Sequence, residues 1–324
     1  MSKYRTSLPQ LNGKTVLTDG GLETVMVFQE GVDLPLFAAF HLMNSEEGLQ
    51  RLRTYFDRYI PLAKRAGVGF LLESLTWRAS PGWTAQLGLT DADMARINRD
   101  SIAFLEDVRT EHETEATPMV ISGCVGPRGD GYDPGTLMTE AEAEAYHAQQ
   151  IGVLADTAAD VVSALTMNNV PEAIGITRAA QKAGIPVAIS FTVETDGKLP
   201  TGEELAAAIA AVDRATGQGP AYFMINCAHP THFAAALAEN PRIRGLRANA
   251  SSCSHEELDN AEVLDDGNPV ELGGQFAELM RLNPQLTVLG GCCGTDHRHI
   301  ERAGHRKVSG RDAAGHPQHK WRNK

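Results

Sequence analysis

The chain has 324 residues, 42% of them hydrophobic, and a net charge of −12. This is enough apolar material for a full core, and the length fits a single α/β barrel. The negative charge gives no attractive field for nucleic acid or for an anionic membrane, so small molecules are the expected partners. The first twelve residues lack an apolar signal segment, and no stretch reaches the roughly 18 apolar residues of a membrane span, so we expect a soluble cytoplasmic protein. Nothing in the sequence fixes the oligomeric state, and a homo-oligomer stays open.

Eight short apolar runs, each bounded by glycine, proline or polar residues, are candidate strands. They lie at residues 15–17, 69–72, 118–122, 160–165, 186–191, 221–225, 245–250 and 287–289. Segments with helical spacing lie between them, at residues 45–66, 91–109, 139–157, 171–183 and 203–215. Ser45, Thr90 and Thr139 each precede an acidic residue, which is the pattern of a helix N-cap.

This alternation of strands and helices predicts a parallel sheet with helices outside it. Eight repeats favour a closed (β/α)8 TIM barrel, a single domain, over an open doubly wound sheet. Two irregular spacings, a loop at residues 123–135 and an acidic stretch between residues 247 and 287, are expected to shape the active-site rim. We assign residues 1–303 to the barrel. Residues 304–324 are basic and almost without apolar side chains, and we predict that they end in a flexible C-terminal tail.

In a barrel of this kind the residues directly after each strand carry the chemistry. Asp19 and Gly20 follow the first run, Glu73 and Trp77 the second, Asn226 and Cys227 the sixth, and Cys292 and Cys293 the eighth. We therefore expect these residues to lie around one site.

Three of them are cysteines, and the five cysteines of the chain do not form a disulfide-scaffold pattern. Three thiolates with an open fourth position are typical of a catalytic zinc site, because a structural site usually has a fourth protein ligand. Glycines at 290, 291 and 294 give the backbone the freedom that lets Cys292 and Cys293 reach one ion with Cys227. Two alternatives stay open, namely ordinary packing of the cysteine pair and a phosphate cradle at residues 290–294.

Three motifs occur in chain order: Thr-Asp-Gly-Gly at residues 18–21, Asn-Cys-Ala-His-Pro at 226–230 and Gly-Gly-Cys-Cys-Gly-Thr at 290–295. Together they resemble the signatures of the homocysteine S-methyltransferase family, over residues 15–303. The resemblance implies a zinc barrel that moves a methyl group from a sulfonium, quaternary ammonium or folate donor to the thiol of homocysteine. It implies that Cys227, Cys292 and Cys293 hold the zinc and that Asp19 and Asn226 line the homocysteine pocket, with Asp19 orienting the substrate amine or a nearby amide.

Two positions depart from the family pattern. Members usually carry a carboxylate after the fourth strand, expected to hold the ammonium group of the substrate, and this chain has Leu165 there. Glu73 and Glu194 lie at neighbouring strand ends, and we hypothesise that Glu73 replaces the carboxylate, because an acid after an apolar run is costly to bury without a cationic partner. Trp77 stands where many members have tyrosine, which predicts either a surface for a methyl-bearing cation or packing on the rim.

The sequence thus predicts a zinc-dependent S-methyltransferase that takes a methyl group from a sulfonium or quaternary ammonium donor. The acceptor would be homocysteine, which becomes methionine, or a related thiol. Because zinc deprotonates a bound thiol, we expect no catalytic residue beyond the metal site. Alternatives are a zinc barrel that acts on a different thiol, a non-catalytic thiol or metal sensor, and a zinc hydrolase that uses Asp19, Glu73 and His229. The sequence does not identify the methyl donor.

Overall fold

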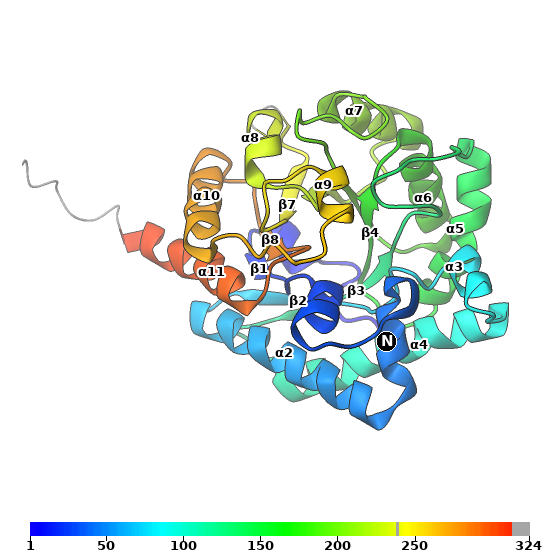
Figure 1. Ribbon diagram of the computed structural model, residues 1–324, viewed down its shortest axis with the longest axis horizontal. Helices are drawn as coiled ribbons and strands as arrows, with labels where there is room; N and C mark the ends of the chain where they lie inside the picture. The colour runs from blue at the N-terminus through cyan, green and yellow to red at the C-terminus, as the bar shows by residue number, and fades with distance from the viewer. Residues whose placement is uncertain (238–239, 313–324) are drawn as a thin grey trace, which may run out of the picture.

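The computed structural model of the protein describes residues 1–237 and 240–312. Eight parallel strands form a closed barrel, in which each strand pairs with the next and β8 pairs with β1 (Figure 1). The strands are β1 Val16–Leu17, β2 Gly69–Glu73, β3 Met119–Val125, β4 Val161–Met167, β5 Val187–Phe191, β6 Tyr222–Asn226, β7 Ile243–Ala248 and β8 Val288–Gly291. Every strand overlaps one of the predicted apolar runs. The predicted (β/α)8 barrel is confirmed, and the open sheet is excluded.

Helices surround the barrel. The longer ones are α2 Glu46–Ala66, α4 Asp91–His112, α5 Glu140–Ala155, α6 Val170–Ala183, α7 Leu205–Thr216, α8 Pro230–Leu237, α10 Pro269–Leu282 and α11 His297–Asp312. Shorter ones are η1 Pro9–Asn12, α1 Leu22–Thr24, η2 Val25–Gln29, η3 Pro35–Phe37, η4 Ala39–Asn44, α3 Pro81–Gln86 and α9 His255–Asp259. Ser45, Thr90 and Thr139 cap α2, α4 and α5 as predicted, since each side chain accepts a hydrogen bond from a backbone N–H in the first turn.

Both faces of the strands are buried, which explains why the sequence shows continuous apolar runs rather than alternation. One face fills the barrel interior with side chains such as Leu71, Tyr222 and Met224. The other face packs under the helices, as Phe70 and Leu72 do. The interior is therefore a packed core, and the site has to lie at one end of the barrel.

Two segments lie over the carboxyl ends of the strands: the turn of chain from α1 to η4, drawn in blue in Figure 1, and the segment around α9, drawn in gold. The predicted acidic stretch after β7 contains α9 and also α10, which completes the barrel repeat. Sequence periodicity missed α10 because its interior holds Gly273 and Gly274, which are poor helix formers. A side chain at Gly273 would collide with Arg302 of α11, so the glycine allows the two helices to pack closely.

Helix α11 packs against α2 and α10 and runs past the predicted domain boundary at residue 303. The last twelve residues of the predicted tail, 313–324, lie outside the described residues. The division into barrel and tail stays a prediction. Within the described part of the chain, each helix is too short or too polar to cross a membrane.

Candidate functional site

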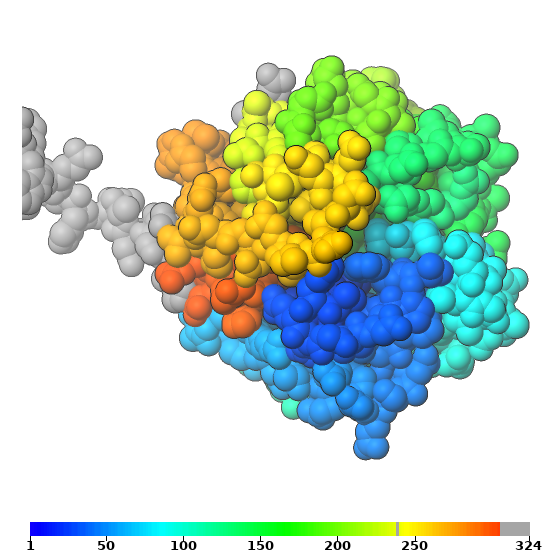
Figure 2. Space-filling model, in the orientation of Figure 1, coloured from blue at the N-terminus to red at the C-terminus, as the bar shows by residue number. Residues whose placement is uncertain are grey.

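A cavity of about 540 Å³ opens at the carboxyl ends of the strands. All eight residues predicted for the site line it: Asp19, Gly20, Glu73, Trp77, Asn226, Cys227, Cys292 and Cys293. Phe28 and Phe37 from the segment between α1 and η4 also line it, as do Leu258 and Asp265 from the segment around α9. Figure 2 shows the two segments that carry these residues, in blue and gold, side by side on this face. The structure therefore brings the predicted residues together in one partly covered pocket.

The three cysteines form a compact cluster in this cavity. Cys227 follows β6, Cys292 and Cys293 follow β8, and their sulfur atoms all lie within 4.8 Å of one another. The Sγ atoms of Cys227 and Cys293 are 3.7 Å apart. Among the described residues this is the group of metal-ligating side chains close enough to share an ion. His229, needed for the hydrolase alternative, does not line the cavity and instead contacts Thr231.

Backbone geometry explains how two strand ends deliver three thiols to one point. Cys227 has a left-handed backbone with φ of 54°, and the ring Nε2 of His255 donates a hydrogen bond to its carbonyl at 2.8 Å. On the β8 side, Gly294 has φ of 78°, as the predicted bend requires. Gly290 and Gly291 serve a different purpose from the one predicted, because a Cβ there would lie 1.8 Å and 1.9 Å from the Oγ1 atoms of Thr18 and Thr295. Their role is close packing of β8 on its neighbours.

The same loop is not a phosphate cradle, because its backbone donors are already used. The N–H groups of Gly291 and Cys292 donate to the carbonyls of Asp19 and Ala248, at 2.9 Å and 2.8 Å. Gly294 N–H donates to Thr24 Oγ1 at 3.2 Å. A phosphate-binding loop needs such groups free to point at the ligand.

The thiols also influence one another electrostatically. Hydrogen bonds from Cys292 and Cys293 lower the pKa of Cys227 well below its usual value. The same contacts raise the pKa of Cys293, and hydrogen bonding to Cys227 raises that of Cys292 to about 12. Cys227 is therefore the thiol that ionises first, and the other two act as its donors until a cation replaces their protons.

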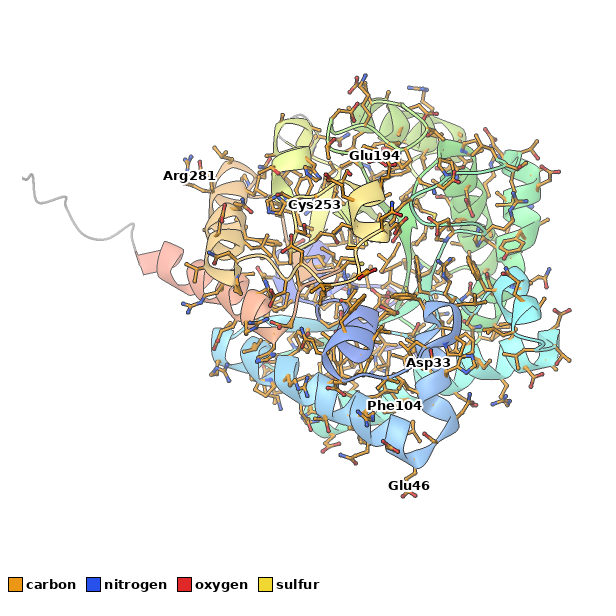
Figure 3. The ribbon with its side chains drawn as sticks, viewed as in Figure 1. Asp33, Glu46, Phe104, Glu194, Cys253 and Arg281 are labelled. Atoms are coloured by element: carbon orange, nitrogen blue, oxygen red, sulfur yellow. The ribbon has the colours of Figure 1, made fainter. Side chains whose placement is uncertain are left out.

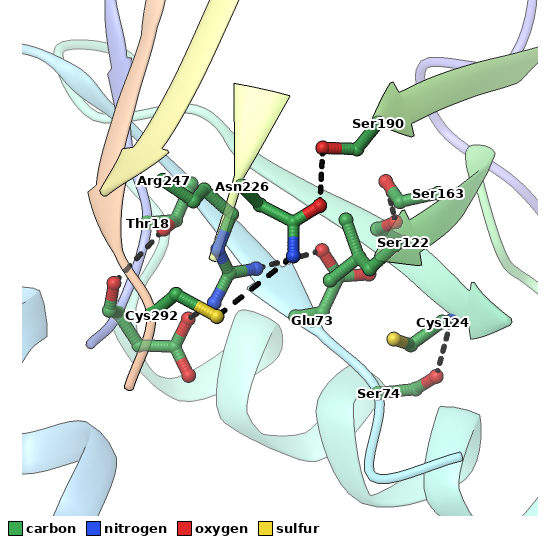
Figure 4. A network of polar contacts seen from close by, with 12 residues as sticks. Thr18, Glu73, Ser74, Ser122, Cys124, Ser163, Ser190, Asn226, Arg247 and Cys292 are labelled. Atoms are coloured by element: carbon green, nitrogen blue, oxygen red, sulfur yellow. Dashed lines mark hydrogen bonds and ion pairs between the residues drawn. The ribbon is translucent and has the colours of Figure 1, made fainter. Parts of the chain in front are cut away.

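Asn226 lines the cavity, but its hydrogen bonds go to the protein. Its Oδ1 accepts from the backbone N–H of Thr166 at 2.8 Å and from Ser190 Oγ at 2.6 Å. Its Nδ2 donates to Thr166 Oγ1 at 2.8 Å and contacts Cys292 Sγ at 3.8 Å, as Figure 4 shows. Asn226 thus ties the ends of β4, β5 and β6 together and orients the Cys292 thiol.

Sequence reasoning missed Arg247, which lies at the centre of the site. This β7 residue is 5% exposed, and its guanidinium contacts Asp19 Oδ1 at 2.7 Å. It also contacts Glu73 Oε2 at 3.0 Å (Figure 4). Tyr55 donates to the other Asp19 oxygen at 3.1 Å. A charged residue inside the apolar run at 245–250 was the available signal, because a buried arginine requires acidic partners.

Arg247 changes the expected roles of the two acids. The cationic partner that we expected for Glu73 is supplied by the protein, and both oxygens of Asp19 are occupied by Arg247 and Tyr55. Burial raises the pKa of Asp19, with Arg247 acting in the opposite direction, and burial raises the pKa of Glu73 to about 7. Two carboxylates therefore share one guanidinium. That either acid also contacts substrate stays a prediction.

The three other candidate positions, Trp77, Gly20 and Glu194, differ in their surroundings. Arg78 lies 4.0 Å from the ring centre of Trp77 and 3.5 Å from that of Trp83, so one face of Trp77 is covered by a cation of the protein itself. A Cβ on Gly20 would lie 2.6 Å from the carbonyl oxygen of Thr295, which shows that Gly20 lets β1 approach the cysteine loop. Glu194, the other candidate for the ammonium group, lies outside the cavity lining beside α9 (Figure 3) and pairs with His255 at 3.0 Å.

Comparison with known proteins adds an independent finding. The family model for homocysteine S-methyltransferase matches residues 16–306. The chain belongs to the homocysteine S-methyltransferase family. The predicted family is confirmed.

Individual relatives are more distant. The chain is similar to methionine synthase of Mycobacterium leprae, with 29% identity over 237 residues, which are 65% of this chain and 18% of that protein. It therefore spans less than a fifth of this relative's length. Among solved structures it resembles the oxidized form of the homocysteine methyltransferase MmuM from Escherichia coli, with 20% identity, a TM-score of 0.71, and coverage of 90% of this chain and 96% of that one. The metallated form of MmuM gives 19% identity, a TM-score of 0.72, and coverage of 91% and 98%. These likenesses support the barrel fold.

Proposed function

We propose that this protein is a zinc-dependent S-methyltransferase that transfers a methyl group from a sulfonium or quaternary ammonium donor to homocysteine, forming methionine, or to a related thiol. The observation that carries the proposal is the cluster of three cysteine sulfurs within 4.8 Å in the cavity of a chain that belongs to this family. We further propose a cytoplasmic location, because five free cysteines fit a reducing compartment.

The cysteines fit a zinc ion in number, chemistry and spacing. Two thiolates on a tetrahedral zinc lie about 3.8 Å apart, given Zn–S bonds of about 2.3 Å. The Cys227 and Cys293 sulfurs, 3.7 Å apart, already have this spacing. Three protein ligands leave the fourth position for an exchangeable ligand, which is typical of catalytic zinc. Soft thiolates favour zinc over magnesium or calcium.

When bound by Cys227, Cys292 and Cys293, zinc would supply the chemistry that makes the acceptor a thiolate at neutral pH. The protein's own residues prepare the site for this. Asn226 fixes the position of the Cys292 sulfur, and His255 holds the strained backbone at Cys227. Leu22, Phe28 and Leu165 line the walls, where they reduce the water that would otherwise solvate a nucleophilic thiolate.

The charge of the lining supports a cationic donor. Among the described lining residues are six carboxylates, of Asp19, Glu23, Glu73, Asp130, Asp259 and Asp265, against the two guanidinium groups of Arg78 and Arg247. A negative pocket attracts an onium compound and repels a polyanion such as a folate. Transfer of the methyl group from an onium to a thiolate also reduces charge, which a poorly solvating pocket favours.

The test is to purify the protein without a metal-binding tag, measure its zinc content, and follow methyl transfer to homocysteine by mass spectrometry. The donors would be S-methylmethionine, S-adenosylmethionine, a dimethylsulfonio compound and betaine. About one zinc per chain, with methionine formed from one donor, is the expected result. Zinc without methionine from any donor would remove homocysteine as acceptor, and a zinc-free protein under reducing conditions would contradict the metal site.

A further inference from the structure

An amino-acid thiol brings an ammonium group into the cavity, and burying that charge requires an acidic partner. The wall formed by β4 does not provide one, because Leu165 stands there, inside the strand. Leu165 is 7% exposed there, and it packs with Cys124 and Trp77 in an apolar cluster. A thiol held at the cysteine cluster therefore has to direct its ammonium group toward another wall.

Three acids considered above each have a basic partner in the protein. Asp19 and Glu73 both pair with Arg247, and Tyr55 occupies the second oxygen of Asp19. Glu194 pairs with His255 and does not line the cavity. Of the remaining acids in the lining, Asp130, Asp259 and Asp265 are exposed at the rim, where water screens their charge.

Glu23 differs from all of these. It lies in α1, immediately after the glycines that follow β1, and it lines the cavity together with Asp19 and Cys292. Its side chain is half-buried, yet within the described ranges it makes no ion pair and no hydrogen bond with another side chain. The two cations of the described lining are engaged elsewhere: Arg247 pairs with Asp19 and Glu73, and Arg78 pairs with Asp130 at 4.0 Å. Neither forms an ion pair with Glu23.

An acid in this position is unfavourable by itself. Burial raises the pKa of Glu23 to about 7, because the carboxylate loses solvation and the attraction of Arg247, which forms no ion pair with it, does not make up the loss. A bound cation would compensate for that loss. Among the acids of the described lining, Glu23 is therefore the half-buried one whose carboxylate is left free to pair with a positively charged ligand group.

We propose that Glu23 binds the ammonium group of the amino-acid thiol acceptor and so determines the selectivity of the enzyme for amino-acid thiols over thiols that lack an amine. The proposal rests on the proposed function and adds to it a specificity residue on the β1 side of the cavity. It places the ammonium group opposite the apolar β4 wall, near the cysteine cluster that holds the acceptor's sulfur.

Binding to the zinc-loaded protein, measured by calorimetry in the absence of any methyl donor, tests this directly. The probes are homocysteine and 4-mercaptobutanoate, which has the same thiol, chain length and carboxylate but no amine. The native protein should bind homocysteine more tightly, and Glu23→Gln should weaken that binding by about ten- to a hundredfold, the effect of losing a charge-assisted hydrogen bond. Binding of 4-mercaptobutanoate should not weaken.

Asp33→Asn is the matched control, because it removes the same charge from an exposed residue of the same N-terminal segment that lies outside the cavity lining (Figure 3). It should leave both affinities unchanged. The role of Glu23 would be overturned if Glu23→Gln lost the same affinity for both thiols. It would also be overturned if Glu73→Gln, and not Glu23→Gln, lost affinity for homocysteine. If Glu23→Gln does not fold, the affinities of the native protein for the two thiols still test the proposal, because equal affinities exclude an ammonium site.

The same measurements separate this inference from the proposed function. A native protein that binds both thiols equally and methylates them keeps the proposed function and rejects the Glu23 site. A zinc-loaded protein that binds neither thiol contradicts both.

Discussion

The two ends of the barrel each contain a buried arginine paired with aspartate, but they use it differently. At the amino end Asp160 is fully buried, and it accepts hydrogen bonds from Arg109, at 2.9 Å, and from the backbone N–H groups of Lys3, Tyr4 and Ile121. At the carboxyl end one guanidinium, that of Arg247, serves the two carboxylates of Asp19 and Glu73. The first network is balanced, whereas the second leaves an excess of negative charge beside the cavity.

This difference separates stability from function within one fold. The Asp160 carboxylate already accepts hydrogen bonds from four donors, so a ligand would add nothing to it. The role of this network is to close the amino end of the barrel and to hold the N-terminal segment in place. An under-compensated pair of acids, next to three thiols, favours the arrival of cations. Changes at the carboxyl end should therefore alter metal and substrate binding, and changes at the amino end should alter only the free energy of unfolding.

The largest effect is expected from Cys292→Ser. A serine hydroxyl is not deprotonated as a thiol is, so the site loses one of three anionic ligands and with it the zinc. Zinc content should fall from about one per chain to near zero, and turnover should fall by about a thousandfold or more, measured by metal analysis and mass spectrometry.

Cys253→Ser is the matched control, since Cys253 is exposed and does not line the cavity (Figure 3). It should retain both zinc and turnover. Full activity in Cys292→Ser would show that the cysteine cluster is only packing.

Replacing the buried arginine at each end should lower the free energy of unfolding by different amounts. Arg247→Met leaves two buried carboxylates without a cation and should cost about 3–5 kcal/mol of unfolding free energy. Arg109→Met should cost less, about 1–3 kcal/mol, because Asp160 keeps three backbone donors. Urea unfolding at neutral pH measures both, and a larger loss at Arg109 would reverse the comparison.

A smaller effect, confined to the metal, is expected from Asn226→Ala. The amide orients Cys292, and removal of such a supporting contact typically lowers metal affinity by about 10- to 100-fold. Competition with a chelator measures the change. Ser190→Ala removes a neighbouring contact of Asn226 but leaves its amide on Cys292, so it should affect zinc binding much less.

The sequence predicted the barrel well because each strand is a buried apolar run followed by a turn, and such runs are local features. It also predicted which residues meet at the carboxyl end, since every parallel strand ends on the same face. It did not predict which charged side chains form ion pairs with one another. Arg247 lies 174 positions from Glu73, and only the closed barrel places it between the two acids. Glu23 was missed for a related reason, because it lies in a short helix after β1 whose fold over the cavity depends on contacts with the rest of the rim.

The subtlest difference between the two ends is the protonation of Glu73. Its carboxyl has a pKa of about 7 in the folded protein, against 4.5 ordinarily, because burial outweighs Arg247. Below pH 4.5 both folded and unfolded chains hold this proton. Between 4.5 and 7 the unfolded chain releases it first, so the stability that this carboxyl contributes is lost as the pH rises.

The amide of Glu73→Gln does not titrate, so the variant should not lose stability through this group as the pH rises. The unfolding free energy of the native protein minus that of the variant should therefore decrease from pH 4.5 to 7, by at most about 1.4 kcal/mol per pH unit. Urea unfolding of both proteins across this range gives the difference, and the thiols cancel because both proteins contain them. A difference that does not change with pH would mean that Arg247 keeps Glu73 ionised throughout, in which case the carboxyl end holds its acids as firmly as the amino end holds Asp160.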